Sequence, residues 1–222
     1  MSRPHIFKLP CELQLKTLDQ LSHDLESLAA LESTCRFYRG LFHEHKAKFL
    51  HAAVVKRKLI PKRLLTEAIL VQKVPRNTPE DVVAAGEGVA MVELLHRYQA
   101  LGAVDAEIKL TDLSMREALS MAKFHQVIVE SLAAYHVEYC RKQMKTRRWY
   151  WDRPTSPREA LRIRKALYRF ELYLRALGDS GHHRALRSYF VKHLDPDTRP
   201  HEVDQLIDIQ SFLQQIIQEG PS

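Results

Sequence analysis

Apolar residues recur at helical spacing along most of this 222-residue chain, and no stretch alternates convincingly between apolar and polar residues. The chain has only seven glycines, so few positions favour a break inside a helix. Hydrophobic residues make up 45% of the sequence, which is enough for a buried core. These features together predict an all-α protein.

The first fifty residues carry the densest leucine pattern. Residues 9–13 read Leu-Pro-Cys-Glu-Leu, and Pro10 suits the start of a helix because its missing N–H costs little there. Ser22 or Asp24 can cap a second helix, and Gly40 is expected to stop a helix before a third one at about residues 41–55. So small a module cannot bury all of its leucines alone. Some of this apolar surface must therefore contact the rest of the chain or a partner.

This layout resembles an F-box, the helical module that docks a protein onto the Skp-type adaptor of a cullin ubiquitin ligase. The resemblance rests on Leu-Pro-x-Glu-Leu near the start, then Asp24-Leu25 and Leu28, and then Cys35-Arg36 before a third apolar helix. The pattern departs from the family at Thr17, where a large aliphatic residue is common. The resemblance implies that the adaptor binds Leu9, Pro10, Leu13, Leu18, Leu21, Leu25 and Leu28.

Two later segments resemble sequences shared by uncharacterised F-box-like proteins of filamentous fungi. They are residues 156–173 and residues 200–206 with the helix that follows. The resemblance implies an F-box-like module at residues 1–55 and a helical, target-binding domain at residues 56–222. It also implies a substrate-recruiting ligase subunit, but it names no target. The alternatives are an F-box-like interaction protein that has lost adaptor binding and a basic helical nucleic-acid-binding protein.

The chain after residue 60 is predicted to be helical. A capping box at Ser114 opens the longest helix, which has two apolar faces and is therefore expected to lie at the centre of a bundle. A second capping box at Ser156 opens another helix. The helices predicted here are at about residues 61–72, 78–101, 114–144, 157–177, 185–193 and 201–218.

Basic residues are concentrated in residues 141–169, which contain eleven Lys or Arg and two acidic residues, a net charge of +9. The rest of the chain has a net charge of about −2 (23 basic and 25 acidic residues). The predicted basic surface consists of Arg147, Arg148, Trp149, Trp151, Arg158, Arg162, Lys165 and Arg169. This surface could bind phosphates and stack on bases, or it could dock an acidic protein partner. A solvated ridge whose aliphatic stems cover the core is the favoured interpretation over nucleic-acid binding.

Sequence motifs of catalysis are absent: the chain has no P-loop, no dinucleotide fingerprint and no nucleophile elbow. His136 and Cys140 have metal-ligand spacing but no second pair, so they are expected to be packing residues. We therefore expect no enzyme, no metal and no cofactor. The three distant cysteines, the absence of a signal-peptide core after Met-Ser-Arg-Pro-His and the absence of any long apolar run favour a cytoplasmic or nuclear location.

Overall fold

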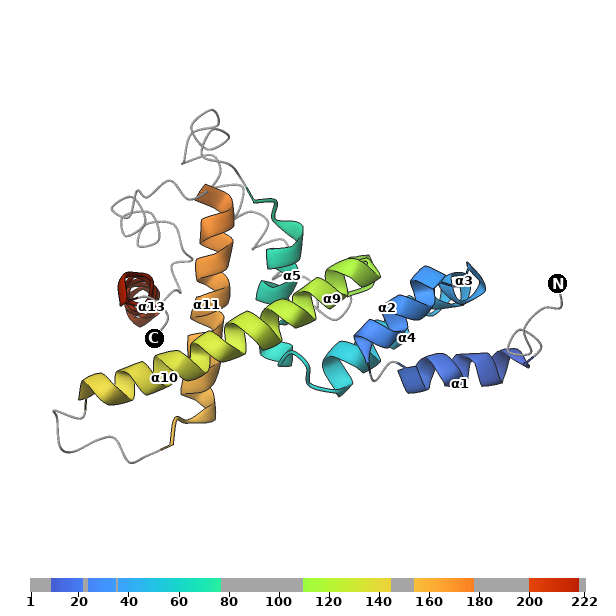
Figure 1. Cartoon of the computed structure of the whole chain (residues 1–222), viewed down its shortest axis with the longest axis horizontal. Coiled ribbons are helices and arrows are strands. Elements are labelled where there is room, and N and C mark those ends of the chain that lie inside the picture. The colour runs from blue at the N-terminus through green and yellow to red at the C-terminus, as the bar shows by residue number, and fades with distance from the viewer. Residues whose placement is uncertain are drawn as a thin grey trace.

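The computed structural model describes residues 9–21, 24–34, 36–76, 110–144, 154–177 and 200–219. All regular elements in these ranges are helices and none is a strand, so the prediction of an all-α protein is confirmed. The helices predicted at residues 78–101 and 185–193 lie outside the described ranges. Figure 1 shows an elongated molecule with the N-terminal helices at one end and the crossing helices of the second half at the other.

A helix cap and hydrogen bonds between helices stabilise the N-terminal part of the fold. Asp24 caps the second helix, because its Oδ1 accepts a 2.9 Å hydrogen bond from the Glu26 N–H. Hydrogen bonds from the Ser27 hydroxyl and the Glu26 N–H lower the pKa of Asp24. Arg39 donates to the carbonyls of Glu32 and Ser33 at the end of the same helix. The four helices are α1 (Cys11–Leu21), α2 (Leu25–Thr34), α3 (Arg36–Glu44) and α4 (Lys46–His51).

Gly40 does not stop a helix, contrary to the prediction. Helix α3 runs through Gly40, because the buried Tyr38, Leu41 and Phe42 hold the turns on both sides against the core. The predicted helix at residues 41–55 is therefore divided between α3, α4 and the π-helical segment η2 (Ala52–Lys56). The chain turns after η2 at Lys58, whose φ is 57°.

Helix α5 (Leu65–Lys73) is the most enclosed element of the described structure. The helix predicted at about residues 61–72 is present as the short 3₁₀ helix η3 (Lys62–Leu64) followed by α5. Most of its side chains are buried, including those of Leu65, Ile69 and Leu70. It packs against α9 (Met115–Lys123) and α11 (Pro157–Leu177), whereas the N-terminal helices meet the second half where α2 contacts α9 and α4 contacts the 3₁₀ helix η4 (Leu110–Asp112).

The long helix predicted from Ser114 to about residue 144 is present and begins with the predicted capping box. Ser114 Oγ accepts from the Glu117 N–H at 3.2 Å, and Glu117 Oε2 accepts from the Ser114 N–H at 2.6 Å. Burial raises the pKa of Glu117, but hydrogen bonds from Ser114 and Lys73 outweigh it and lower the pKa to about 2. Along the axis, α9 continues into the π-helical segment η5 (Phe124–Val129) and then into α10 (Glu130–Met144).

The expectation that this long helix is covered on both apolar faces fails near its middle. Met115, Met121 and Val129 are buried on the face that meets α5 and α11, but Val127 and Ile128 are exposed. Helix α2 packs against α9 as well, so the long helix is contacted by the N-terminal helices in addition to α5 and α11. The capped helix predicted at residues 157–177 is also confirmed as α11, with Ser156 Oγ accepting from the Glu159 N–H at 3.2 Å.

Helix α11 crosses α10, and α13 (Pro200–Glu219) packs against α11, as Figure 1 shows. Phe212 of α13 lies against the rings of Tyr135, His136 and Tyr139 on α10. The buried core runs without interruption from Leu18 in α1 to Ile209 in α13. The domain boundary proposed at residues 55/56 falls inside η2 and stays a prediction.

Candidate partner-binding surface

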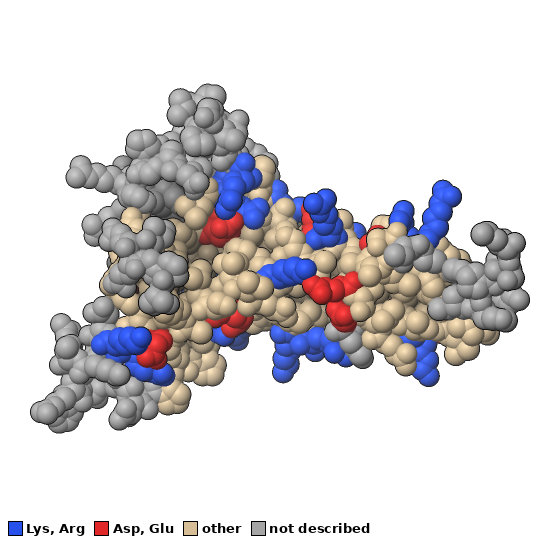
Figure 2. Space-filling model, in the orientation of Figure 1, with Lys and Arg blue, Asp and Glu red and all other residues tan. Residues whose placement is uncertain are grey.

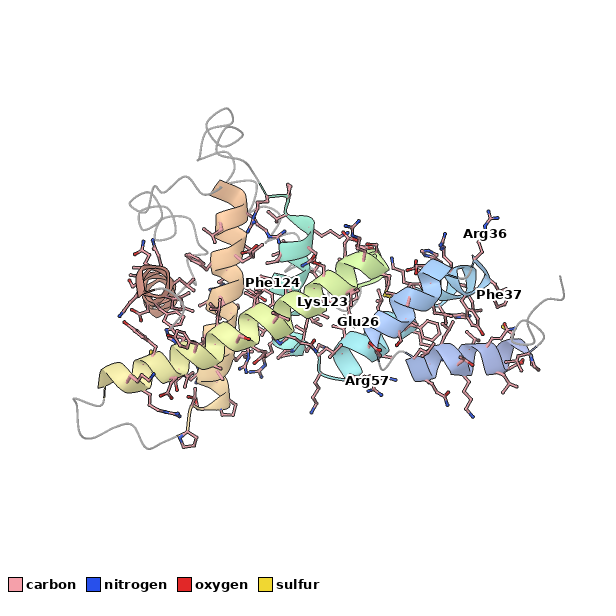
Figure 3. All side chains as sticks on the ribbon, in the orientation of Figure 1. Glu26, Arg36, Phe37, Arg57, Lys123 and Phe124 are labelled. Atoms are coloured by element: carbon pink, nitrogen blue, oxygen red, sulfur yellow. The ribbon has the colours of Figure 1, made fainter. Side chains whose placement is uncertain are left out.

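Three large apolar side chains are exposed at the N-terminal end of the molecule. Leu9 is 38% exposed, Leu13 is 47% exposed and Phe37 is 46% exposed. Figure 1 places the start of α1 and helix α3 at the same end, and Figure 3 shows Phe37 projecting from α3 there. We call these three residues the N-terminal apolar surface. Large apolar groups left in water in this way are candidates for contact with a partner.

Gln14 fixes the position of Leu9. Its side chain is buried, and its Nε2 donates a 2.8 Å hydrogen bond to the Leu9 carbonyl. The Pro10 carbonyl accepts from the Gln14 N–H at 3.2 Å, so Gln14 binds both of the residues that precede the helix. Leu9 is therefore held against α1 although it precedes the helix.

The seven residues predicted to bind the adaptor divide into two groups. Leu9, Pro10 and Leu13 are exposed and available to a partner. Leu21 is half-buried, and Leu18, Leu25 and Leu28 are buried in the core of the chain itself. A rigid partner can therefore contact only the first part of the predicted set. The adaptor-binding role of the seven stays a prediction.

Phe37 was not singled out from the sequence. Tyr38, Leu41 and Phe42 form the buried face of α3, and Phe37 lies beside that face on the helix. Its ring packs edge-on against Tyr38 with the ring centres 5.6 Å apart, so the exposed ring is supported from behind. The sequence alone does not show that Phe37 is exposed, because its place on the helix depends on where α3 begins.

Thr17 is accommodated at the position where the sequence departs from the F-box pattern. Its hydroxyl donates a 2.9 Å hydrogen bond to the Leu13 carbonyl one turn earlier. The polar group is thus satisfied within α1, next to the buried Leu18. Leu13, directly below it on the helix, remains exposed.

The predicted basic surface is only partly exposed. Arg147, Arg148, Trp149 and Trp151 lie outside the described residues. On α11, Arg158 is exposed, whereas Arg162, Lys165 and Arg169 are half-buried. Lys165 Nζ lies 3.3 Å from Oε1 of Glu67, a carboxylate that is 2% exposed. Lys165 therefore belongs to an internal ion pair between α5 and α11.

A second set of interacting polar side chains, which the sequence did not predict, joins η5 and α10 to α11. His125 Nε2 lies 3.0 Å from Glu130 Oε1, and His125 Nδ1 lies 3.2 Å from the Tyr168 hydroxyl. Glu130 also accepts two hydrogen bonds of 2.7 Å from Arg164. Burial, with the charges of Glu67 and Glu130, raises the pKa of Tyr168, so its hydroxyl stays protonated. Because the Glu130 carboxylate can only accept, a neutral His125 carries its proton on Nε2, and its Nδ1 accepts from the Tyr168 hydroxyl.

Burial lowers the pKa of His125; the Glu130 carboxylate opposes this shift and Arg164 adds to it. The imidazole is consequently neutral at neutral pH. The hydrogen bonds from Arg164 are the main reason that the pKa of Glu130 is low. His125 and Tyr168 are both buried, so this group of residues acts as a link between helices.

His136 and Cys140 lie together, with Sγ 3.8 Å from each ring nitrogen. His136 packs edge-on against Phe212, and burial lowers its pKa. Burial also raises the pKa of the Cys140 thiol, which disfavours the reactive thiolate.

Within the described ranges, no group of three His, Cys, Asp or Glu side chains is placed to hold a metal ion. The helices described in these ranges include none that is long and apolar enough to cross a membrane.

No protein-family model, no curated protein and no solved structure matches this chain.

Proposed function

We propose that this chain is a substrate-recruiting F-box subunit of a Skp–cullin–F-box ubiquitin ligase and that it binds the Skp-type adaptor through the N-terminal apolar surface. The observation that carries the proposal is the position of Leu9 and Leu13. They are the first and last residues of the Leu-Pro-Cys-Glu-Leu segment, and both remain exposed while later leucines form the core. The transfer of ubiquitin would take place on other subunits.

The free energy gained by covering this surface is of the size expected for the central part of a protein–protein interface. Covering the exposed parts of Leu9, Leu13 and Phe37 is worth roughly 1–2 kcal/mol each, or about 5 kcal/mol together. Micromolar binding needs about −8 kcal/mol after the costs of association. The apolar residues would therefore supply the hot spot, and polar residues around them would supply the rest.

Exposed charged residues are available for that polar rim. Glu12 lies between Leu9 and Leu13 in the sequence, and Arg36 precedes Phe37. Figure 3 shows Arg36 extending from α3 near Phe37. Charges of this kind fix the orientation of a partner more than they add affinity.

Nucleic-acid binding, the main alternative from the sequence, receives less support from the described part of the basic stretch. Arg164 is committed to Glu130 and Lys165 is paired with Glu67. Arg141 also lies 3.4 Å from Glu138. Each cation paired in this way is less available for a phosphate.

The proposal is tested by titrating a purified Skp-type adaptor with the full chain in a calorimeter. The wild-type chain should bind with micromolar affinity or better. The double variant Leu9→Ser/Leu13→Ser should lose about 2–3 kcal/mol, or roughly 30- to 150-fold in affinity, and Phe37→Ser about half of that free energy. Circular dichroism should show unchanged helix content, because the substituted residues are exposed.

The matched control is Val127→Ser/Ile128→Ser, which removes two exposed apolar side chains from α9–η5–α10 instead. This control should bind the adaptor as the wild-type chain does. Failure of the wild-type chain to bind the adaptor, or equal binding by the Leu9/Leu13 variant, would overturn the proposal.

A further inference from the structure

A second exposed apolar surface lies on the long helix, away from the N-terminal apolar surface. Val127 is 62% exposed and Ile128 is 43% exposed. They border a shallow, open hollow of about 480 Å³. We call this hollow the helix groove and define it by an apolar floor of Leu119, Phe124, Val127 and Ile128, with Ser120 as an uncharged polar residue and Arg116 and Lys123 as its cationic residues.

All seven residues come from α9 and η5, and Arg116 is followed at helical spacing by the adjacent pairs Leu119-Ser120, Lys123-Phe124 and Val127-Ile128. The stretch from residue 116 to residue 128 extends about 18 Å along the axis, which is roughly three helical turns. A hollow of this length and composition suits the apolar face of another helix, whose side chains would enter at positions i, i+3 or i+4, and i+7. Figure 2 shows mostly uncharged surface where α9 continues into α10.

The charges at the helix groove are positive. Arg116 is exposed and has no ion pair within the described part of the chain, and Lys123 is seven residues further on. Lys123 Nζ lies 2.7 Å from a carboxylate oxygen of Glu26. Figure 3 shows Lys123 and Glu26 pointing toward one another from α9 and α2. A carboxylate presented by a neighbouring helix therefore already meets one of these cations.

We infer that the helix groove binds an amphipathic helix of a protein partner, with acidic residues about seven positions apart beside its apolar stripe. The spacing follows from Arg116 and Lys123, which the two carboxylates would meet. The pair between Lys123 and Glu26 is exposed, so exchanging Glu26 for a carboxylate of the partner costs little. Identifying this partner as the target of the ligase rests on the proposed function, whereas the binding of the helix does not.

Charge also argues against a second copy of the chain as the occupant. Between residues 116 and 128 the one acidic residue is Glu117, whose carboxylate is bound to Ser114 and Lys73. Two grooves facing each other would therefore oppose cations to cations. Nucleic acid fits poorly as well, because two cations beside an apolar floor provide few phosphate contacts.

The test is a selection from a display library of helical peptides of about 18 residues, using the full chain as bait. Enriched peptides should be amphipathic, with Asp or Glu about seven positions apart next to the apolar stripe. The best peptide is then synthesised with a fluorophore, and its affinity is measured by anisotropy. Val127→Ser/Ile128→Ser should weaken binding at least about tenfold, and Arg116→Glu/Lys123→Glu should do the same for the acidic peptide.

Absence of any enriched peptide, enrichment of basic or uncharged peptides, or affinities unaffected by both double variants would overturn the inference. Binding of the wild-type chain to phosphatidylserine-containing vesicles that is lost in Val127→Ser/Ile128→Ser would overturn it too, because the surface would then be a lipid contact. The variant Leu9→Ser/Leu13→Ser separates the two proposals. It should bind the peptide normally even if adaptor binding fails, and circular dichroism should confirm that every variant is folded.

Discussion

The side-chain amide of Gln14 donates a hydrogen bond to the backbone carbonyl of Leu9, and Gln14 is only 4% exposed. A buried amide is thus satisfied by the residue that precedes α1. The same bond holds an exposed leucine in one place before any partner arrives. Order of this kind lowers the entropy that binding must otherwise remove.

Replacing Gln14 by alanine should therefore affect both stability and binding. We expect a loss of about 1–2 kcal/mol in the free energy of unfolding and a further weakening of adaptor binding by roughly three- to tenfold. Urea denaturation and calorimetric titration measure the two effects. Ser33→Ala is the control, because it removes a side-chain hydrogen bond to the Ala30 carbonyl in α2 without involving Leu9 or Leu13. If Gln14→Ala binds the adaptor with wild-type affinity, the ordering of Leu9 is irrelevant to binding.

Gly40 lies exposed inside α3, and a Cβ built there meets no atom within 4 Å. Gly40→Ala should stabilise the protein by up to about 1 kcal/mol, since glycine costs more backbone entropy in a helix than alanine. Thermal and urea denaturation should both show the gain. The reverse change at an exposed alanine of α4, Ala47→Gly, should destabilise by a similar amount. A loss of stability in Gly40→Ala would mean that the helix is not continuous at this position.

Much of the fold could be predicted from local signals. The caps at Asp24 and Ser114 and the regular apolar spacing of α11 and α13 are properties of short segments, so they could be read without knowledge of packing. Gly40 was misread because a glycine signals a helix end only when packing does not hold the turns around it. The π-helical segment η5 was not predicted, because nothing in its six residues marks it in the sequence.

The candidate sites were less predictable. Leu9 and Leu13 were identified, but periodicity could not show that Leu18, Leu25 and Leu28 form the chain's own core. The exposure of Val127 and Ile128 depends on which helices lie opposite. The links from Lys165 to Glu67 and from His125 to Tyr168 join residues far apart in sequence, so no local spacing reveals them.

Acid should weaken the link made by His125. Because its pKa is lowered in the folded protein, the unfolded chain takes up a proton at a higher pH than the folded chain does. The stability that the neutral imidazole contributes is complete above about pH 6.5 and is lost as the pH falls below that value. The free energy of unfolding, measured in urea, should therefore decrease between pH 7.5 and pH 5, by at most about 1.4 kcal/mol per pH unit for one proton.

His125→Gln should flatten this pH dependence, because glutamine does not titrate. His136, whose pKa burial also lowers, retains its own contribution in that variant. His43→Gln is the control, since His43 is exposed on α3. An unchanged slope in His125→Gln would show that the histidine does not control stability in this range.

The ion pair between Lys165 and Glu67 distinguishes an internal role of the basic stretch from an external one. Lys165→Met should destabilise the protein by about 3 kcal/mol, because it removes a cation from beside a carboxylate that is almost fully buried. Changing both residues, in Lys165→Met/Glu67→Leu, should recover most of that loss, since the buried charge is removed as well. Arg158→Gln, which removes an exposed cation from the same helix, should change the free energy of unfolding by no more than about 0.5 kcal/mol. Urea denaturation of the wild-type chain and the three variants measures these differences. Oligonucleotide binding by the wild-type chain and Lys165→Met is measured beside it. If Lys165→Met is as stable as Arg158→Gln but binds the oligonucleotide more weakly than the wild-type chain, Lys165 is a phosphate contact and not a structural cation.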